Sequence, residues 1–429
     1  MSSVSRIELR DSTERWYLAA LLTSGMIFCY AHRSALGVAA PFMIKDLGLN
    51  PAVMGILLSA FFWSYALMQM PAGWLVDRFG VRRSYALGYL FWSLASAATG
   101  MAGSLVGLAS LRMAVGVGQA VSFPASARAV ANWFQERERG TVTALYLTGV
   151  RLGTALVAGL GAYMLSRSNW KLFFVLTGLV PLVWLFPWMR FLKRWDDRRL
   201  GTASSARSAE SFLASLALLR QRTVLGIFLG FFAYDYAWFV YLTWLPGYLV
   251  LERGFSAREM GIYSSVPYLV MSVIIMVSGV LSDWMIRRGA AEIRVRKSFV
   301  IVGLLVGCLI IPAGMVEEKM TAVWLLTVSL CGLGICSPNT WTLTQAVSAK
   351  NVVGTVSGIQ NFGGNLGGIL APAFTGFIAH VTHSFALALG LTGAVLIAGV
   401  FAYYLLVGEQ IRSLDSPTDA EVAAPLSVR

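Results

Sequence analysis

The sequence predicts an all-α membrane protein with twelve transmembrane helices, and three observations support this fold class. The mean hydropathy is +0.68, with 57% hydrophobic and only 13% charged residues, whereas charged residues make up about 25% of a soluble protein. Long apolar runs alternate with short charged or Gly/Pro-rich breaks. Lys and Arg are concentrated in every second break. Helices are the expected form of these runs, because a segment in lipid must satisfy its own backbone hydrogen bonds.

Each apolar run is long enough to cross a bilayer, which takes roughly 20 residues. Taken in order, the spans are expected near 17–40, 51–76, 83–102, 105–131, 141–165, 170–192, 223–250, 258–285, 297–315, 320–347, 353–380 and 384–407.

The longest polar break lies at 193–222 and divides the spans into two groups of six. It begins with the charged run from Lys193 to Arg199 and continues through a Ser/Ala-rich piece. We therefore expect an N-terminal six-helix half in 1–192, a cytoplasmic linker in 193–222, a C-terminal six-helix half in 223–408 and a cytoplasmic tail in 409–429.

The distribution of basic residues predicts that both termini are cytoplasmic. With that orientation, the cytoplasmic side receives most of the Lys and Arg residues, including the whole cluster from Arg190 to Arg222. The opposite side receives only Lys45, Arg167, Lys171, Arg253, Arg258 and Lys319. This asymmetry follows the positive-inside rule. The first sixteen residues are polar and have no hydrophobic region, so no cleavable signal is expected.

Composition and motifs exclude several other classes. The net charge of +13 is explained by cytoplasmic loops, so we do not expect a nucleic-acid partner. Four cysteines lie in or near apolar runs without ligand spacing, and are interpreted as small buried side chains. We find no phosphate-binding loop, metal-ligand cluster or nucleophile triad. The sequence therefore predicts no cofactor, no metal, no catalytic residue and no enzyme activity.

Three arginines lie inside apolar runs, where a cation costs at least ~2.5 kcal/mol unless it faces protein or water. Arg33 lies roughly 25 Å along the first span at 1.5 Å per residue. Arg112 falls at a similar depth in the fourth span, and Arg151 lies near the middle of the fifth. Guanidinium groups suit carboxylates because they form a charged, planar fork. The alternatives are a structural acid or snorkelling for Arg33, a structural or gating role for Arg112, and pairing with Asp235 or a backbone carbonyl for Arg151.

Polar side chains in other spans are candidates for the same cavity. Tyr30 lies one turn from Arg33. The others share helix faces in the second, tenth and eleventh spans: Tyr65, Gln69, Trp341, Gln345, Asn361 and Asn365. Phenols and amides of this kind suit a polyhydroxylated solute. For each residue the alternative is a hydrogen bond between helices.

The two halves contain similar segments. Gly73-Trp-Leu-Val-Asp77-Arg78-Phe-Gly80-Val-Arg82-Arg83 follows the second span, and Gly279-Val-Leu-Ser-Asp283 with Arg287 and Arg288 follows the eighth. Equivalent positions in two six-span halves indicate a parallel internal repeat about an axis normal to the membrane.

These motifs resemble those of the major facilitator superfamily. The segment from Gly73 to Arg83 is similar to its signature loop, and Arg112 with Gly116 and Gly118 to its fourth-span motif. Thr243–Leu249 with Glu252–Phe255, and Asn361–Pro372, resemble the anion:cation symporter family, which includes carriers of galactonate, hexuronates and glucarate and is related to vesicular glutamate transporters and sialin. The resemblance extends from Trp16 to Gly408. It implies that Asp77, Arg78, Arg82 and Arg83 form a cytoplasmic gate.

The chain departs from the family pattern at two positions that carry protons in relatives. His32 replaces an aspartate before the first-span arginine, and Gln119 replaces a glutamate seven residues after Arg112. His32 is expected either to take the proton role or to make a neutral polar contact. Asp235 is the remaining intramembrane acid, with a proton-carrying or a structural role.

The resemblance implies a secondary transporter of small organic anions, such as a sugar acid, working by proton symport and alternating access. The alternatives are an uncoupled facilitator or an anion exchanger, and a receptor that binds an anion without moving it. We expect a monomeric, multi-pass protein of the inner (plasma) membrane, in contact with lipid and with protons as a possible coupling ion.

Overall fold

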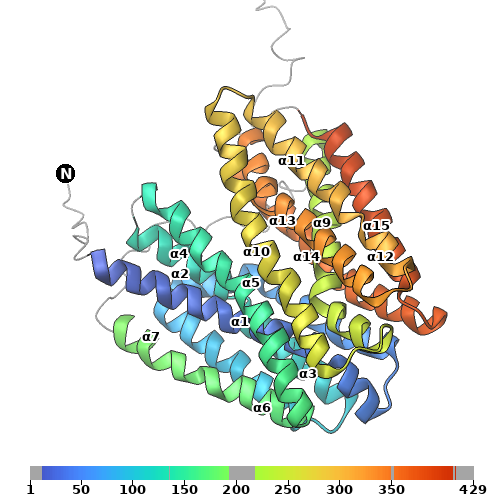
Figure 1. Ribbon diagram of the computed structural model, residues 1–429. Coiled ribbons are helices and arrows are strands. Elements are labelled where there is room, and N and C mark those ends of the chain that lie inside the picture. The colour runs from blue at the N-terminus through green and yellow to red at the C-terminus, as the bar shows by residue number, and fades with distance from the viewer. Residues whose placement is uncertain (1–11, 135, 193–217, 349–351, 409–410, 412–429) are drawn as a thin grey trace, which may run out of the picture.

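The computed structural model describes residues 12–134, 136–192, 218–348, 352–408 and 411, and these residues are almost entirely helical (Figure 1). The elements are α1 (Ser12–Leu47), α2 (Pro51–Thr99), α3 (Leu105–Gln119), α4 (Ser122–Trp133), α5 (Glu136–Arg167), α6 (Trp170–Leu179), η1 (Val180–Trp184), α7 (Leu185–Leu192), η3 (Leu218–Arg220), α9 (Arg222–Leu251), α10 (Ala257–Arg287), α11 (Glu292–Gly307), α12 (Ile310–Met315), α13 (Lys319–Val347), α14 (Val353–Thr382), α15 (Ala386–Phe401) and η4 (Ala402–Leu406).

The helical class predicted from the sequence is confirmed. Eleven helical stretches of the described chain are long and apolar enough to cross a membrane. The second and third predicted spans both lie in α2, where two helices meet at a kink at Gly80, with a φ of 80°. Glycine tolerates this left-handed conformation because it has no Cβ. The cytoplasmic placement of the termini stays a prediction. Most of the expected linker, at 193–217, and of the tail lies outside the described residues.

Helix starts follow local sequence signals. Asn50 caps α2 by accepting a hydrogen bond from the Val53 amide at 2.9 Å, with Pro51 at the first helical position. Ser256 and Glu259 form a reciprocal capping box at the start of α10. Such caps satisfy amides that have no partner within the helix.

The helices before residue 193 and those after residue 217 form two bundles, drawn blue to green and yellow to red in Figure 1. The bundles touch through several helix pairs of the described chain, which include α5 with α9 and the three that follow. Gly37 of α1 lies against the Thr243 backbone of α9. Ser59 of α2 donates a hydrogen bond to the Ile369 carbonyl of α14 at 2.6 Å. Ser265 of α10 donates to the Ala155 carbonyl of α5 at 3.0 Å.

Helices α2 and α14 pack closely at one end of their shared face and are separated at the other. Gly55 of α2 packs against the backbone of α14 at Pro372 and Gly376. Gly73 lies about five turns further along α2, on the same face as Gly55. A side chain at Gly73 would meet no atom within 4 Å. The matching face of α14 shows the same change, because Gly354 and Gly358 also have open space. The two faces therefore separate toward the end that holds Asp77.

Candidate functional site

Arg33 lies in an aromatic cage at the junction of the bundles. Its side chain is 5% exposed, and its guanidinium carbon lies 4.4 Å from the Tyr30 ring centre, 4.8 Å from Phe61 and 4.5 Å from Tyr65. Arg33 Nη1 donates to the Tyr30 hydroxyl at 3.1 Å, and Nη2 is buried with no hydrogen-bond partner among the described residues. Neither of the two alternatives, a structural acid or snorkelling, is observed. The cage holds a positive charge that has no ion-pair partner within 4.0 Å among the described residues and has a free N–H edge.

Gln119 and Arg112 of the neighbouring α3 both form hydrogen bonds with Arg33. Gln119 Oε1 accepts from Arg33 Nε at 3.2 Å, and Gln119 Nε2 donates to the Cys29 carbonyl at 2.9 Å. Arg112 Nη2 donates to the backbone carbonyl of Arg33 at 3.3 Å, while Arg112 Nε has no partner in the described chain. Gln119 therefore orients Arg33, and Arg112 adds a second cation beside it.

Arg151 of α5 crosses from one bundle to the other. Its guanidinium carbon lies 3.7 Å from the ring centre of Trp238 in α9, and its Nη2 donates to the Tyr234 hydroxyl at 3.4 Å. Neither of the partners expected from the sequence, the Asp235 carboxylate or a backbone carbonyl, contacts Arg151 in the described structure. Stacking on an indole holds the cation by cation–π attraction. This contact leaves Arg151 Nη1 buried without a partner among the described groups.

Asp235 is half-buried and lies close to both cationic positions. It interacts electrostatically with Arg151 and Arg33, but no ion pair within 4.0 Å or hydrogen bond to its carboxylate is found among the described residues. Its carboxylate occupies the space that a side chain at Gly364 would fill. A carboxylate so placed is close enough to influence both arginines and remains unpaired.

His32 is buried inside the bundle formed by the helices before residue 193. The imidazole is 1% exposed, and Nδ1 lies 2.8 Å from the Phe28 carbonyl one turn earlier. Nε2 is buried with no hydrogen bond to the described groups. The proton role of His32 stays a prediction.

The other predicted site residues fall into two groups. Gln69, Asn361 and Asn365 lie on the facing stripes of α2 and α14 where these helices begin to separate, and Asn365 donates to the Asn361 carbonyl at 2.9 Å. Trp341 is 37% exposed and stacks edge-on against Phe231, and Gln345 is exposed one turn further along α13. Phe61, Tyr234 and Trp238 were not predicted. Their one sequence signal is i, i+4 spacing. Phe61 lies one turn before Tyr65, and Trp238 lies one turn after Tyr234.

The signature loop forms its ion pair inside one bundle. Asp77 at the α2 kink pairs with Arg128 of α4, a residue not singled out from the sequence. Arg78 packs over the Trp74 ring at 5.4 Å. Arg82 accepts a bond from the Trp188 indole through its backbone carbonyl at 3.1 Å, and Arg83 is exposed. The gating role of this loop stays a prediction.

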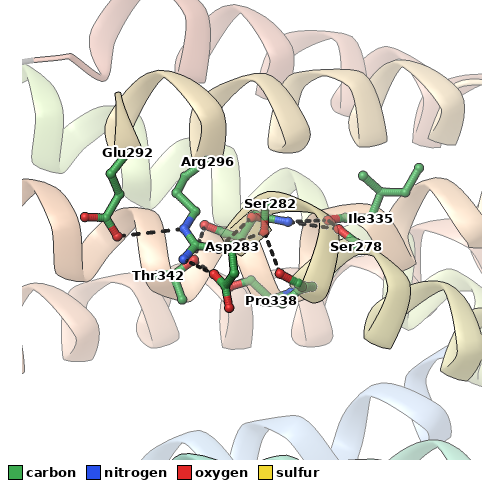
Figure 2. Close-up of polar contacts among 10 residues, drawn as sticks. Ser278, Ser282, Asp283, Glu292, Arg296, Ile335, Pro338 and Thr342 are labelled. Atoms are coloured by element: carbon green, nitrogen blue, oxygen red, sulfur yellow. Dashed lines mark hydrogen bonds and ion pairs between the residues drawn. The ribbon is translucent and has the colours of Figure 1, made fainter. Parts of the chain in front are cut away.

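The repeated segment in the second bundle builds a larger polar network, shown in Figure 2. Arg296 of α11 donates to the Asp283 carboxylate at 2.5 Å and to the Ser282 hydroxyl at 2.8 Å, and lies 3.9 Å from Glu292 (Figure 2). Asn339 of α13 lies 3.4 Å from Arg296 and donates to Ser278 at 2.9 Å. The network joins α10, α11 and α13.

We expect Arg296→Met to lower the apparent melting temperature of the detergent-purified protein by several degrees. The change removes the donor to the Ser282 hydroxyl and the Asn339 side-chain carbonyl, and it leaves Asp283 without its ion-pair partner, a loss of about 2 kcal/mol. Arg294→Met on the same helix is the matched control, because Arg294 is exposed. Equal melting temperatures for both variants would contradict a stabilising role for the network.

Within the described part of the chain, no cluster of His, Cys, Asp or Glu has the arrangement of a metal site. Fold and site together define a polytopic helical membrane protein, with unpaired cations where its two bundles meet. Intramembrane charges of this kind mark solute or ion pathways.

The family is shown by comparison with known proteins. A family model described as the Major Facilitator Superfamily matches residues 22–372. The D-galactonate transporter of Escherichia coli O6:H1 is 31% identical over 419 residues, covering 93% of this chain and 97% of that protein. The hexuronate transporter of Bacillus subtilis is 31% identical over 407 residues, covering 93% and 95%.

Solved structures show the same fold. An inward-facing, unoccupied bacterial homologue of the human lysosomal transporter Spinster has a TM-score of 0.76 at 18% identity, covering 92% of this chain and 97% of that chain. A D-xylose–proton symporter has a TM-score of 0.70 at 16% identity, covering 93% and 99%.

The chain belongs to the major facilitator superfamily. The resemblance based on the sequence motifs is thereby confirmed, and the protein is a multi-pass membrane transporter and not an enzyme. The predicted inner-membrane location agrees with this assignment.

Proposed function

We propose that the protein is a secondary transporter of small organic anions of the sugar-acid class, working by alternating access. The observation that carries this proposal is the Arg33 guanidinium, which is buried in an aromatic cage, has a free Nη2 and has no carboxylate partner in the described structure. A buried, uncompensated cation is costly, and a bound carboxylate offsets that cost through charge-assisted hydrogen bonds. The printed names of the relatives, galactonate and hexuronate transporters, support the same solute class.

The surrounding side chains suit a hydroxylated solute. The Tyr30 and Tyr65 rings cover Arg33, and the Gln69 amide nitrogen is buried without a hydrogen-bond partner among the described groups. Asn361 and Asn365 lie opposite, on α14. Phenols and amides both donate and accept hydrogen bonds, as sugar hydroxyls require.

The separation of α2 and α14 toward the Asp77 end supports alternating access. In this state the contacts between bundles lie at the opposite ends of those helices. Rocking one bundle against the other would expose the site to each side in turn. With the orientation predicted from the basic residues, the open end is cytoplasmic.

Counterflow in proteoliposomes tests the transport function. Vesicles loaded with an unlabelled sugar acid should accumulate the labelled acid transiently, because a carrier exchanges solute across both faces. A binding receptor gives binding in detergent without counterflow, so failure of counterflow with retained binding would reject transport.

We further propose proton symport with Asp235 as the proton-binding group. Its carboxylate lies in a membrane span, unpaired among the described residues and within electrostatic range of Arg33 and Arg151. Protonation would remove its electrostatic attraction for both arginines and leave their charge to the solute. Gln119 cannot carry the proton, because its amide does not titrate, and it orients Arg33 instead. Of the three residues predicted for proton coupling, Asp235 and His32 therefore remain.

An inward proton gradient should therefore raise the initial uptake rate of the wild type several-fold, and Asp235→Asn should remove this dependence while retaining counterflow. His32→Gln is the comparison variant and separates the two candidates. Equal rates with and without the gradient in the wild type would exclude symport and leave a facilitator or an exchanger.

A further inference from the structure

The charges around the site do not balance, and this bears on the solute class that the proposed function leaves open. Among the described residues, Arg33, Arg112 and Arg151 contribute three positive charges, and Asp235 contributes one negative charge. His32 adds no negative charge in either protonation state. A solute with one carboxylate would leave one positive charge uncompensated if Asp235 is ionised, and two if Asp235 holds the proton of the proposed symport. An uncompensated charge at mid-depth of the membrane is costly.

Arg33 and Arg151 are each placed to bind a carboxylate, and we call them the two anchors. Arg33 is held by Tyr30, Phe61 and Tyr65 and has Nη2 free. Arg151 is held against Trp238 and has Nη1 free. In each case aromatic rings cover the flat face of the guanidinium and leave an N–H at its edge. The edge of a guanidinium is the part that binds a carboxylate in a fork.

The two anchors lie at the same level of the bundle. The Ser34 hydroxyl, next to Arg33, donates to the Thr154 hydroxyl at 3.4 Å, and Thr154 lies one turn beyond Arg151 on α5. Arg151 also acts electrostatically on Tyr30, one turn from Arg33. Both guanidiniums also act electrostatically on the Asp235 carboxylate, so the two arginines lie around one group, with Arg33 on one side and Arg151 reaching toward α9 on the other.

We infer that the transported solute is a dianion, a hydroxylated carbon chain with a carboxylate at each end, of which Arg33 binds one and Arg151 the other. This inference rests on the proposed function, since it assigns the solute class at the same site. Arg112 stands behind Arg33 and strengthens the field at that end. In the empty carrier Asp235 partly compensates the two anchors, and the second carboxylate of the solute takes over that role for Arg151.

The test compares two acids that differ at one terminus. D-Glucarate and D-gluconate have the same number of carbons and the same hydroxyl configuration, but gluconate has a hydroxymethyl group in place of the second carboxylate. Affinities are measured by thermal shift and by inhibition of counterflow in the purified wild type. We expect glucarate to bind at least ~10-fold more tightly, about the effect of one charge-assisted contact of ~1.4 kcal/mol.

Arg151→Gln then identifies the group responsible. It should weaken glucarate far more than gluconate, so that the preference for glucarate falls to about threefold or less. Arg151→Lys retains the charge but loses the fork, and should give an intermediate preference. Arg167→Gln, at the exposed far end of the same helix, is the control and should retain the wild-type preference. Melting curves of the unliganded variants confirm that each is folded.

The outcomes separate this inference from the proposed function. Equal affinity for the two acids, tighter binding of gluconate, or an equal loss of both in folded Arg151→Gln would overturn the dianion and leave an organic-anion carrier. Absence of binding and counterflow with either acid, and with the wider range of sugar acids, would overturn the proposed function and the inference with it.

Discussion

Arg33→Ala is expected to abolish solute binding and uptake while leaving a folded, extractable protein. The variant removes the guanidinium that would face the solute carboxylate, and losing one partner of a buried charge pair costs about 2–5 kcal/mol. That range corresponds to an affinity loss of roughly 30-fold or more at 1.4 kcal/mol per tenfold. Isothermal titration with a sugar acid and initial uptake rates in proteoliposomes measure the two effects.

Arg33→Lys separates charge from geometry. The ammonium group retains the positive charge but cannot form the two parallel hydrogen bonds of a guanidinium, so affinity should fall between those of the wild type and Arg33→Ala. Arg167→Gln is the control, because Arg167 is exposed and packs over Tyr163 at the far end of α5. Uptake by Arg33→Ala at the wild-type rate would remove Arg33 from the site.

Gly376→Leu is expected to disfavour the conformation described above and to lower transport by about tenfold or more. A side chain at Gly376 would meet the Pro51 carbonyl of α2, and it would also lie 2.8 Å from the Trp244 ring and 3.0 Å from Gly55 Cα. Overpacking of this kind costs about 1–3 kcal/mol. If the alternative state lacks this contact, the cost falls on one state alone and shifts the equilibrium by that amount.

A reporter thiol measures the shift. Ser59→Cys, in a background without the native cysteines, places a thiol at a position that is 3% exposed in the α2–α14 contact. Labelling should be slow on its own and faster when combined with Gly376→Leu. Gly390→Leu is the control, since a side chain there would meet no atom within 4 Å. Unchanged labelling in both combinations would contradict the expected opening of this contact.

Much of the fold could be predicted because the signals are local. Apolar runs of membrane-spanning length mark helices whatever their neighbours, and they placed α5, α9 and α14 to within a few residues. The charged loop after the second span predicted a break before the third, and two helices do meet there in α2. How abruptly they meet was not predicted, because it depends on the positive φ that Gly80 adopts.

The candidate site was predicted in part for the same reason. A cation such as Arg33 is conspicuous in an apolar run, but its cage depends on the side chains that Phe61 and Tyr65 direct toward it from another helix. Trp238 was missed because its contact with Arg151 depends on how α5 and α9 are rotated against each other. Arg128 was missed because helix packing, and not sequence distance, brings it to Asp77.

Every ion pair found among the described residues joins helices or turns of one bundle: Arg15 with Glu138, Asp77 with Arg128, and Arg296 with Asp283 and Glu292. None of these pairs spans the boundary between the bundles, so a hinge motion carries each of them along intact. The resistance to such a motion then comes from separating small-residue, apolar surfaces, from a few neutral hydrogen bonds and the Arg151–Trp238 contact between the bundles, and from the surrounding lipid. Bilayer thickness and fluidity, more than ionic strength, would govern how fast the two bundles swing.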